Sequence, residues 1–207
     1  MIGPRPAGGR AVVLDLDEDA EPAQTAAAVR SLAKQLGVAL LEVVPGAQTV
    51  LVVATGPAGL QQLLAALPRL PSAPTAAETT GVVVELPARY DGADLDHVAR
   101  TTGLSVEQVV HRHSAVVYRS AFSGFAPGFA YLSGLDPVLR LPRRDTPRTA
   151  VPAGSLAVAD GWTAVYPRRT PGGWHLLGTV DVPVFDLGVD PPALLGPGRR
   201  VRFVPTS

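Results

Sequence analysis

The segment GFAPGFAYLSGL, at Gly124–Leu135, opens the part of the sequence that decides the fold. It is followed by TPRTAVPAGS at Thr146–Ser155, TAVYP at Thr163–Pro167 and TPGGWHLLG at Thr170–Gly178. A flexible linker would lack the aromatic residues of these segments, and a helix would not tolerate a proline or glycine every few residues. The pattern indicates short β-strands joined by tight turns. We therefore expect a closed or nearly closed β-barrel from Ala115 onward.

The first third of the chain alternates strand and helix patterns. The order strand, helix, strand, strand, helix is typical of a small α/β sandwich with its helices on one face. It predicts a ferredoxin-like module that lacks its last strand. The strands are expected at Ala11–Leu16, Val38–Val44 and Thr49–Ala54, and the helices at Glu21–Leu36 and Ala58–Leu67.

A domain boundary is predicted at Pro68–Thr80, which is rich in Pro, Ala, Ser and Thr. Beyond it we expect a strand at Gly81–Leu86 and helices at Asp94–Thr101 and Ser105–His113. Ser105 and Gln108 have the spacing of a capping box, which would start the second helix. The predicted fold class is α+β, with a ferredoxin-like α/β domain at residues 1–75 and a β-barrel domain at residues 81–207.

The composition narrows the classes of function. The 207 residues are 46% hydrophobic and carry no net charge, so we expect neither a nucleic-acid partner nor another polyanion. Without cysteine, the chain has no disulfides, thiol nucleophile or zinc–thiolate site. No apolar run approaches a bilayer span, and we expect a cytoplasmic protein with no membrane partner. No phosphate-binding glycine motif follows a strand, so an autonomous nucleotide site is not expected, and no metal ligands are evident.

Two kinds of residue could carry chemistry. Among the histidines, His113 is the best candidate, because it ends the helix that leads into the glycine-rich region, although a helix C-terminus could also simply favour its charged form. For His97, His111 and His175 a structural role is favoured, with His97 on a solvated helix face. Ser155 lacks the context of a nucleophile elbow, so a turn residue is the favoured interpretation.

Three arginines flank one carboxylate. Asp145 lies between Arg143, Arg144 and Arg148, and an ion pair among these residues is the simplest interpretation. The same arginines could instead bind a carboxylate or phosphate, because a guanidinium group matches planar oxyanions. Both interpretations remain open.

The prolines and glycines of the barrel region allow two interpretations as well. They could serve only to build a rigid barrel, since proline stiffens loops and blunts strand edges. They could also form a preorganised rim that presents Phe125, Phe129, Tyr131 and Trp174 to a partner, because aromatic side chains on rigid supports are typical interface anchors.

The blocks GFAPGFAYLSGLDP, PRRDTPRTAVPAGS and TAVYPRRTPGGWHLLG resemble signature blocks of the family of 5-oxoprolinase B subunits, which includes KipI and proteins labelled allophanate hydrolase subunit 1. The upstream segment ELPARYDGADLDHVARTTGLSVEQVVHRHS resembles the same family. The resemblance implies a ferredoxin-like domain followed by a cyclophilin-like β-barrel. It also implies a non-autonomous hydrolase component that works with a homologous C subunit and with an A subunit of the LamB/YcsF type. Together these would convert 5-oxoproline to glutamate, with ATP as the cofactor at the level of the complex.

Two other functions are compatible with the resemblance. One is a KipI-like inhibitor that binds a sensor histidine kinase. The other is a carboxyltransferase or allophanate hydrolase-related subunit that acts with a biotin partner. The sequence departs from the family pattern at Ala164, where a glycine is common, and at Thr179, where an arginine is common.

The resemblance also suggests which residues bind the substrate or a partner. Arg148 is expected to meet an anionic group, the aromatic residues and prolines to form a wall or interface, and the glycines to allow close backbone contact. No catalytic residue is assigned. The predicted binding residues are His113, Phe125, Pro127, Gly128, Phe129, Tyr131, Arg148, Pro152, Gly154, Ser155, Tyr166, Gly172, Gly173 and Trp174.

Overall fold

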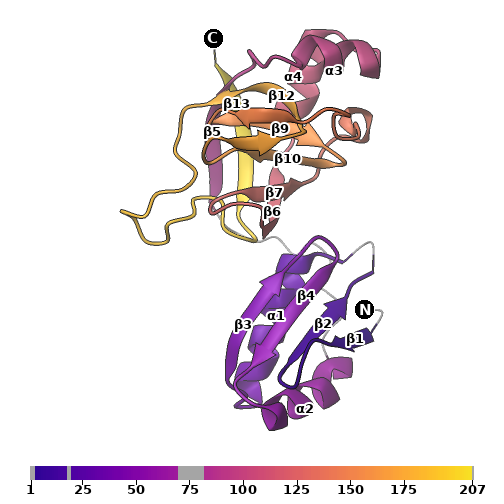
Figure 1. The fold of residues 1–207 in the computed structure, drawn as a ribbon, viewed down its shortest axis with the longest axis vertical. Helices are drawn as coiled ribbons and strands as arrows, with labels where there is room; N and C mark the ends of the chain where they lie inside the picture. The colour runs from indigo at the N-terminus through magenta and orange to yellow at the C-terminus, as the bar shows by residue number, and fades with distance from the viewer. Residues whose placement is uncertain (1–2, 18–19, 70–81, 207) are drawn as a thin grey trace. The chain divides into compact units, whose positions relative to one another are not determined.

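The computed structural model describes residues 3–17, 20–69 and 82–206 (Figure 1). The chain divides into two compact units, Met1–Thr80 and Gly81–Ser207. Most of the boundary predicted at Pro68–Thr80 lies outside the described residues, which end here in a short 3₁₀ helix at Leu67–Arg69. Each unit is described separately below.

The first unit is an antiparallel sheet with helices on one face. The strand order is β1-β2-β4-β3. Alternate residues of the two central strands, Val12 and Leu14 together with Val50 and Val52, are buried against apolar residues of both helices. This pattern confirms the predicted α/β sandwich. Its elements are β1 (Gly3–Pro6), β2 (Ala11–Asp15), α1 (Pro22–Gln35), β3 (Leu40–Pro45), β4 (Thr49–Ala54) and α2 (Pro57–Ala66).

The fourth strand of this sheet comes from the N-terminus and was not expected from the sequence, while no strand follows α2 among the described residues of this unit. Strand β1 pairs antiparallel with β2, and Arg5 donates hydrogen bonds to Asp15 across the pair. The sequence of β1 is GPRP, which carries two prolines and no hydrophobic alternation. Proline is tolerated here because β1 is an edge strand, where one side of the backbone needs no ladder partner.

The second unit contains a closed barrel, as predicted. Its strand order is β10-β7-β6-β13-β5-β12-β9. The barrel strands are β5 (Val83–Arg89), β6 (Tyr118–Ser123), β7 (Ala130–Ser133), β9 (Ser155–Ala159), β10 (Trp162–Val165), β12 (His175–Val180) and β13 (Arg200–Thr206). A separate pair is formed by β8 (Arg148–Val151) and β11 (Thr170–Gly172), and a 3₁₀ helix lies at Pro137–Leu139.

The last strand closes the barrel. Strand β13 lies between β5, with which it pairs in parallel, and β6, with which it pairs antiparallel. Large apolar side chains such as Leu86, Leu132, Leu156, Leu177 and Phe203 are fully buried in its core. The core therefore joins residues from both ends of the second unit.

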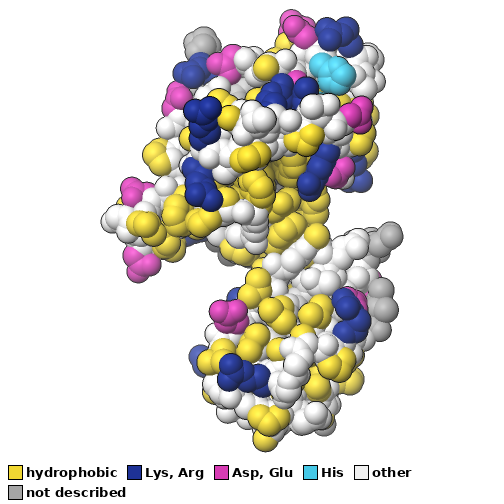
Figure 2. Space-filling view, in the orientation of Figure 1, with side chains coloured by type: hydrophobic (Ala, Val, Ile, Leu, Met, Phe, Trp, Pro, Cys, Tyr) yellow, Lys and Arg dark blue, Asp and Glu magenta, His cyan; other side chains and the backbone are white. Residues whose placement is uncertain are grey.

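Two helices, α3 (Leu95–Thr102) and α4 (Val106–Ser114), accompany the barrel. The predicted capping box is present, because the Gln108 N–H donates to Ser105 Oγ at 3.2 Å and the Ser105 N–H donates to Gln108 Oε1 at 2.9 Å. On the face shown in Figure 2, basic and acidic side chains are interspersed over this unit. No helix among the described residues is long and apolar enough to span a membrane.

Candidate functional site

A buried carboxylate connects three segments of the second unit. Asp94 immediately precedes α3 and is 3% exposed. Its Oδ1 accepts hydrogen bonds from Arg144 Nη1 at 2.7 Å and Arg148 Nη2 at 2.8 Å, and its Oδ2 accepts from the backbone N–H of Leu176 at 2.8 Å. Asp94 thus ties the start of α3 to the segment 142–148 and to the start of β12.

The electrostatics of this cluster keep Asp94 ionised. Burial by itself would raise the pKa of Asp94, but the hydrogen bonds from Arg148 and Leu176 and the charges of Arg148 and Arg144 outweigh it and hold the pKa below its usual value. One carboxylate then faces two guanidinium groups, which leaves the cluster with an excess of one positive charge. Such a cluster can attract an additional anion.

The ion pairs differ from the simplest sequence-based interpretation. The arginines that flank Asp145 pair elsewhere: Arg143 with Asp160 at 3.1 Å, and Arg144 and Arg148 with Asp94. Asp94 lies 50 and 54 residues before its two partners, and no local signal in the sequence connects them. Arg148 pairs with a carboxylate of the protein itself, Asp94, and its expected contact with an anionic group of a substrate or partner stays a prediction.

Most of the predicted aromatic residues lie in one cluster inside the unit. Phe129, Tyr166 and Trp174 are at most 4% exposed, and their rings meet edge to face at centroid distances of 5.3 Å for Phe129–Tyr166 and 5.5 Å for Phe129–Trp174. Tyr131 is half-buried and packs against them. Phe125 differs, because it is 60% exposed and has a positive φ of 68°. Of these five side chains, Phe125 is the one most available to a partner.

Two of the predicted glycines allow close packing around this cluster. Gly128 has φ +80°, and a Cβ there would collide with the side chain of Phe185. At Gly172, a Cβ would collide with the hydroxyl of Tyr166. The other predicted residues of this region lie at the ends of strands. Pro152 and Gly154 are in the turn from β8 to β9, Ser155 begins β9, and Gly173 follows β11.

His113 is part of the barrel core, away from solvent. Its Nδ1 is 2.8 Å from the hydroxyl of Tyr90, and its Nε2 is 2.9 Å from Oγ1 of Thr163. Burial lowers the pKa of His113 to about 3, so the ring is neutral at physiological pH. The alternative in which the helix end favours its charged form is therefore wrong. Its contacts indicate a structural polar group that links α4 to β10.

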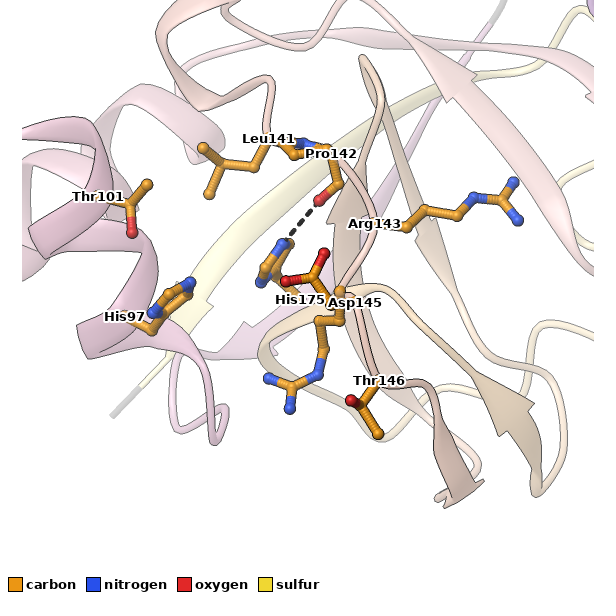
Figure 3. Close-up of a pocket in the computed structure, with 9 residues that line it drawn as sticks. His97, Thr101, Leu141, Pro142, Arg143, Asp145, Thr146 and His175 are labelled. Atoms are coloured by element: carbon orange, nitrogen blue, oxygen red, sulfur yellow. Dashed lines mark hydrogen bonds between the residues drawn. The ribbon is translucent and has the colours of Figure 1, made fainter.

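A cavity of about 350 Å³ lies beside the Asp94 cluster (Figure 3). His97 of α3 and His175 of β12 face one another in it with nearly parallel rings, 5.4 Å between centroids. Neither histidine was favoured as a functional residue from the sequence. His97 is exposed, as expected, but it shares the cavity with His175, which is 5% exposed. The remaining lining residues are Thr101, Leu141, Pro142, Arg143, Arg144, Asp145 and Thr146.

A smaller cavity of about 270 Å³ includes two of the predicted residues, Gly154 and Tyr166, together with the segment Thr179–Val184. It is lined mainly by apolar residues and backbone. Across residues 3–17, 20–69 and 82–206, no group of three or more His, Asp or Glu side chains is arranged to hold a metal ion.

The chain is similar to proteins of one family. The family described as "Carboxyltransferase domain, subdomain C and D" matches residues 3–195. A relative from Escherichia coli O157:H7, named as the B subunit of 5-oxoprolinase, is 43% identical over 80% of this chain and 78% of its own length. A relative of the same name from Bacillus subtilis (strain 168) is 41% identical over 60% of this chain and 53% of its own length.

The fold is shared with a known crystal structure. TTHA0988 superposes with a TM-score of 0.79 at 38% sequence identity. The superposition covers 96% of this chain but 40% of TTHA0988, so the present chain spans less than half the length of that protein.

Proposed function

The chain belongs to the family of carboxyltransferase domains, subdomains C and D, and on this premise we propose that it is the B subunit of an ATP-dependent 5-oxoprolinase. The observation that carries the proposal is the 43% identity to the B subunit of Escherichia coli 5-oxoprolinase, which extends over 80% of the chain. In this proposal the protein works in the cytoplasm with a homologous C subunit and with an A subunit of the LamB/YcsF type. Together they hydrolyse 5-oxoproline to glutamate at the expense of ATP.

The chemistry of the Asp94 cluster supports this substrate. The 5-oxoproline molecule carries a carboxylate, and the cluster has one positive charge in excess. Guanidinium groups bind carboxylates through charge-assisted hydrogen bonds, which are about twice as strong as neutral ones. An anionic substrate would therefore be favoured next to Arg144 and Arg148.

The contacts of Thr163 and His113 lie inside the barrel core. The hydroxyl of Thr163 contacts His113 and donates to the carbonyl oxygen of Ala157 at 3.1 Å inside the barrel. This histidine–hydroxyl pair is committed to the core and does not face a substrate. Because the sequence has neither a phosphate-binding glycine motif nor a pair of carboxylates for acid–base chemistry, we expect that the purified chain by itself shows no 5-oxoproline-dependent ATP hydrolysis, which a coupled ADP-release assay would measure.

Reconstitution tests the proposal directly. Candidate A and C subunits from the same host would be purified separately and mixed with this chain, and glutamate and ADP would be measured with 5-oxo-L-proline and ATP. We expect turnover in the complete mixture and none when this chain is left out. Turnover that is independent of this chain, or none in the complete mixture, would refute the proposal. Co-purification of the tagged chain from its own host would identify the natural partners.

A second candidate is a carboxyltransferase component, which the description of the matching family favours. Such a protein would act with a biotin-carrying partner. A biotinylated protein that co-purifies with the chain, in place of the A and C subunits, would support this alternative.

A further inference from the structure

A hairpin projects from the barrel between β12 and β13. Its two sides, which together comprise residues 184–194 and are called the arm below, are joined by backbone hydrogen bonds. The N–H of Leu194 donates to the oxygen of Val184 at 3.1 Å, and the N–H of Asp186 donates to the oxygen of Pro192 at 2.9 Å. In Figure 1 the arm belongs to the orange to yellow loop on the left of the second unit. The arm is therefore a hydrogen-bonded element of the fold.

The base of the arm is anchored in the barrel. Val184 and the residue that follows the arm, Leu195, are buried and belong to the barrel core. The side chain of Phe185 lies so close to Gly128 that a Cβ at this glycine would collide with it. Because both ends are fixed, the barrel sets the direction of the arm. A contact made by the tip is then preorganised, which lowers the entropy cost of binding.

The tip of the arm is apolar and uncovered. Leu187 is 83% exposed and Val189 is 55% exposed. Between them, the N–H of Gly188 donates to Asp186 Oδ1 at 2.8 Å, and Asp190 follows. Figure 2 shows hydrophobic and acidic side chains together on this projection. A single exposed apolar side chain is ordinary, but two presented together on an anchored arm between two carboxylates favour a contact surface.

The same chain carries a cavity that suits this tip. The smaller cavity, of about 270 Å³, is lined by Val165, Tyr166 and Val180, among others. Its volume lies below the range of typical small-molecule sites, which is roughly 300 to 1,000 Å³, and this favours a side chain as its occupant. Val182 and Val184 line it as well, so the cavity lies at the base of the arm.

The rim of this cavity is basic, whereas the tip of the arm is acidic. Pro167 lines the cavity and is followed directly by Arg168 and Arg169. Both arginines are exposed and have no ion-pair partner in the part of the chain that the structure describes. Asp181 also lines the cavity, but its charge is compensated by Arg89 at 2.8 Å. Opposite charges on the tip and the rim favour their association and orient it.

The arm does not fill the cavity of its own chain, because Leu187 is exposed. The arm of a second copy can do so. In a pair of copies related by a two-fold axis, two arms that run antiparallel place the tip of each at the base of the other. The same contact is then made twice, and the pair is closed.

We propose that this chain forms a two-fold symmetric dimer in which each copy inserts Leu187 into the cavity of about 270 Å³ of the other, with Val189 packed at its mouth. The carboxylates of the tip then face the two arginines of the rim. The proposal concerns the assembly of the chain and does not depend on the 5-oxoprolinase activity.

Two variants test the two sides of this contact. Leu187→Asp places a charge where an apolar side chain would enter the cavity, and it changes the arm alone. Ala153→Phe lies in the turn from β8 to β9 and lines the cavity, so its ring would fill the cavity and leave the arm unchanged. The matched control is Val138→Asp, at another exposed apolar position of the second unit. Melting temperatures would verify that each variant is folded.

Sedimentation velocity over a wide range of protein concentrations would measure the dimer dissociation constant. We expect the wild type and Val138→Asp to dimerise equally. We expect Leu187→Asp and Ala153→Phe each to raise the dissociation constant by at least on the order of tenfold, because each change affects both copies of the contact.

A mixture of the two variants provides the sharper test. In a heterodimer, the intact arm of Ala153→Phe meets the intact cavity of Leu187→Asp, so that one of the two contacts is restored. Neither variant alone can form such a contact. The mixture should therefore contain dimers at a concentration at which each variant alone is monomeric.

Three results would overturn the proposal. One is a wild-type chain that stays monomeric at every concentration. Another is a dimer whose dissociation constant is unchanged by both variants. The third is a mixture that contains no more dimer than the separate variants. If the wild type is monomeric and Leu187→Asp instead weakens binding of a candidate C subunit, the arm contacts a different protein and the second copy is the wrong partner.

Discussion

Replacing Asp94 by Asn should destabilise the second unit strongly, because it leaves two arginines facing one another without a carboxylate. Removing one partner of a buried ion pair typically costs about 3 to 5 kcal/mol. Here the guanidinium groups of Arg144 and Arg148 are 31% and 24% exposed, so water can partly replace the lost carboxylate. We therefore expect a loss of about 2 to 3 kcal/mol in the free energy of unfolding.

Urea denaturation followed by tryptophan fluorescence measures this loss. The two tryptophans, Trp162 and Trp174, both lie in the second unit, so the signal reports that unit alone. The matched control is Asp96→Asn, at an exposed position in the first turn of α3, where we expect a change of about 0.5 kcal/mol. A loss for Asp94→Asn no larger than that of the control would show that the cluster does not hold these segments together.

The pH dependence provides a second check on the same reasoning. The folded pKa of Asp94 is lowered, so its stabilisation is present above the unfolded pKa of about 3.9 and is lost as the pH falls through the folded pKa. The difference in stability between wild type and Asp94→Asn should therefore be full at pH 7 and should shrink in strong acid. A difference that grows as the pH falls would contradict the assigned ion pairs.

Three further outcomes are expected. The folded pKa of His113 is about 3, whereas an unfolded imidazole titrates near 6.5. The wild type should therefore lose stability, by on the order of several kcal/mol, as the pH falls through this interval. In urea titrations at several pH values, His113→Met should show a smaller loss over the same interval. Gly128→Ala should cost about 2 kcal/mol more than Gly198→Ala, because both have positive φ but only Gly128 would collide with a neighbouring side chain; equal urea midpoints would refute this. Phe125→Ala should weaken binding to the C subunit, measured by pull-down and titration, by about 2 kcal/mol with little change in melting temperature. Trp174→Ala should instead cost about 3 to 5 kcal/mol of stability. Unchanged binding by Phe125→Ala would show that Phe125 is not part of the interface.

Local signals in the sequence predicted most of the elements. The barrel follows from the dense spacing of proline, glycine and β-forming residues, and the capping box at Ser105 follows from a spacing of three residues. Strand β1 was missed because GPRP has neither alternation nor β-branched residues, and its strand conformation depends on pairing with β2. The position of β13 between β5 and β6 could not be predicted either, because it joins segments from opposite ends of the unit.

The aromatic residues among the predicted binding residues divide into buried side chains and one exposed side chain. The sequence placed aromatic residues on rigid supports but could not tell which face each side chain takes. Phe129, Tyr166 and Trp174 turned inward and Phe125 outward. All four residues lie in turns or next to the ends of strands, where the strand alternation does not decide the side, and packing with distant strands decides it. The binding roles of the predicted residues stay predictions.

By itself, the sequence determined the fold class, most of the order of the elements and the family resemblance, because periodicity, capping and turn chemistry act over a few residues. The tertiary structure alone decided which charges meet. Asp94 and Arg148 are 54 residues apart, and only the folded second unit brings α3, β8 and β12 together around one carboxylate. The cavity shared by His97 and His175 has the same origin. A Coulomb interaction or hydrogen bond at about 3 Å depends on position in space, and the sequence contains no local feature that encodes such a distant pair.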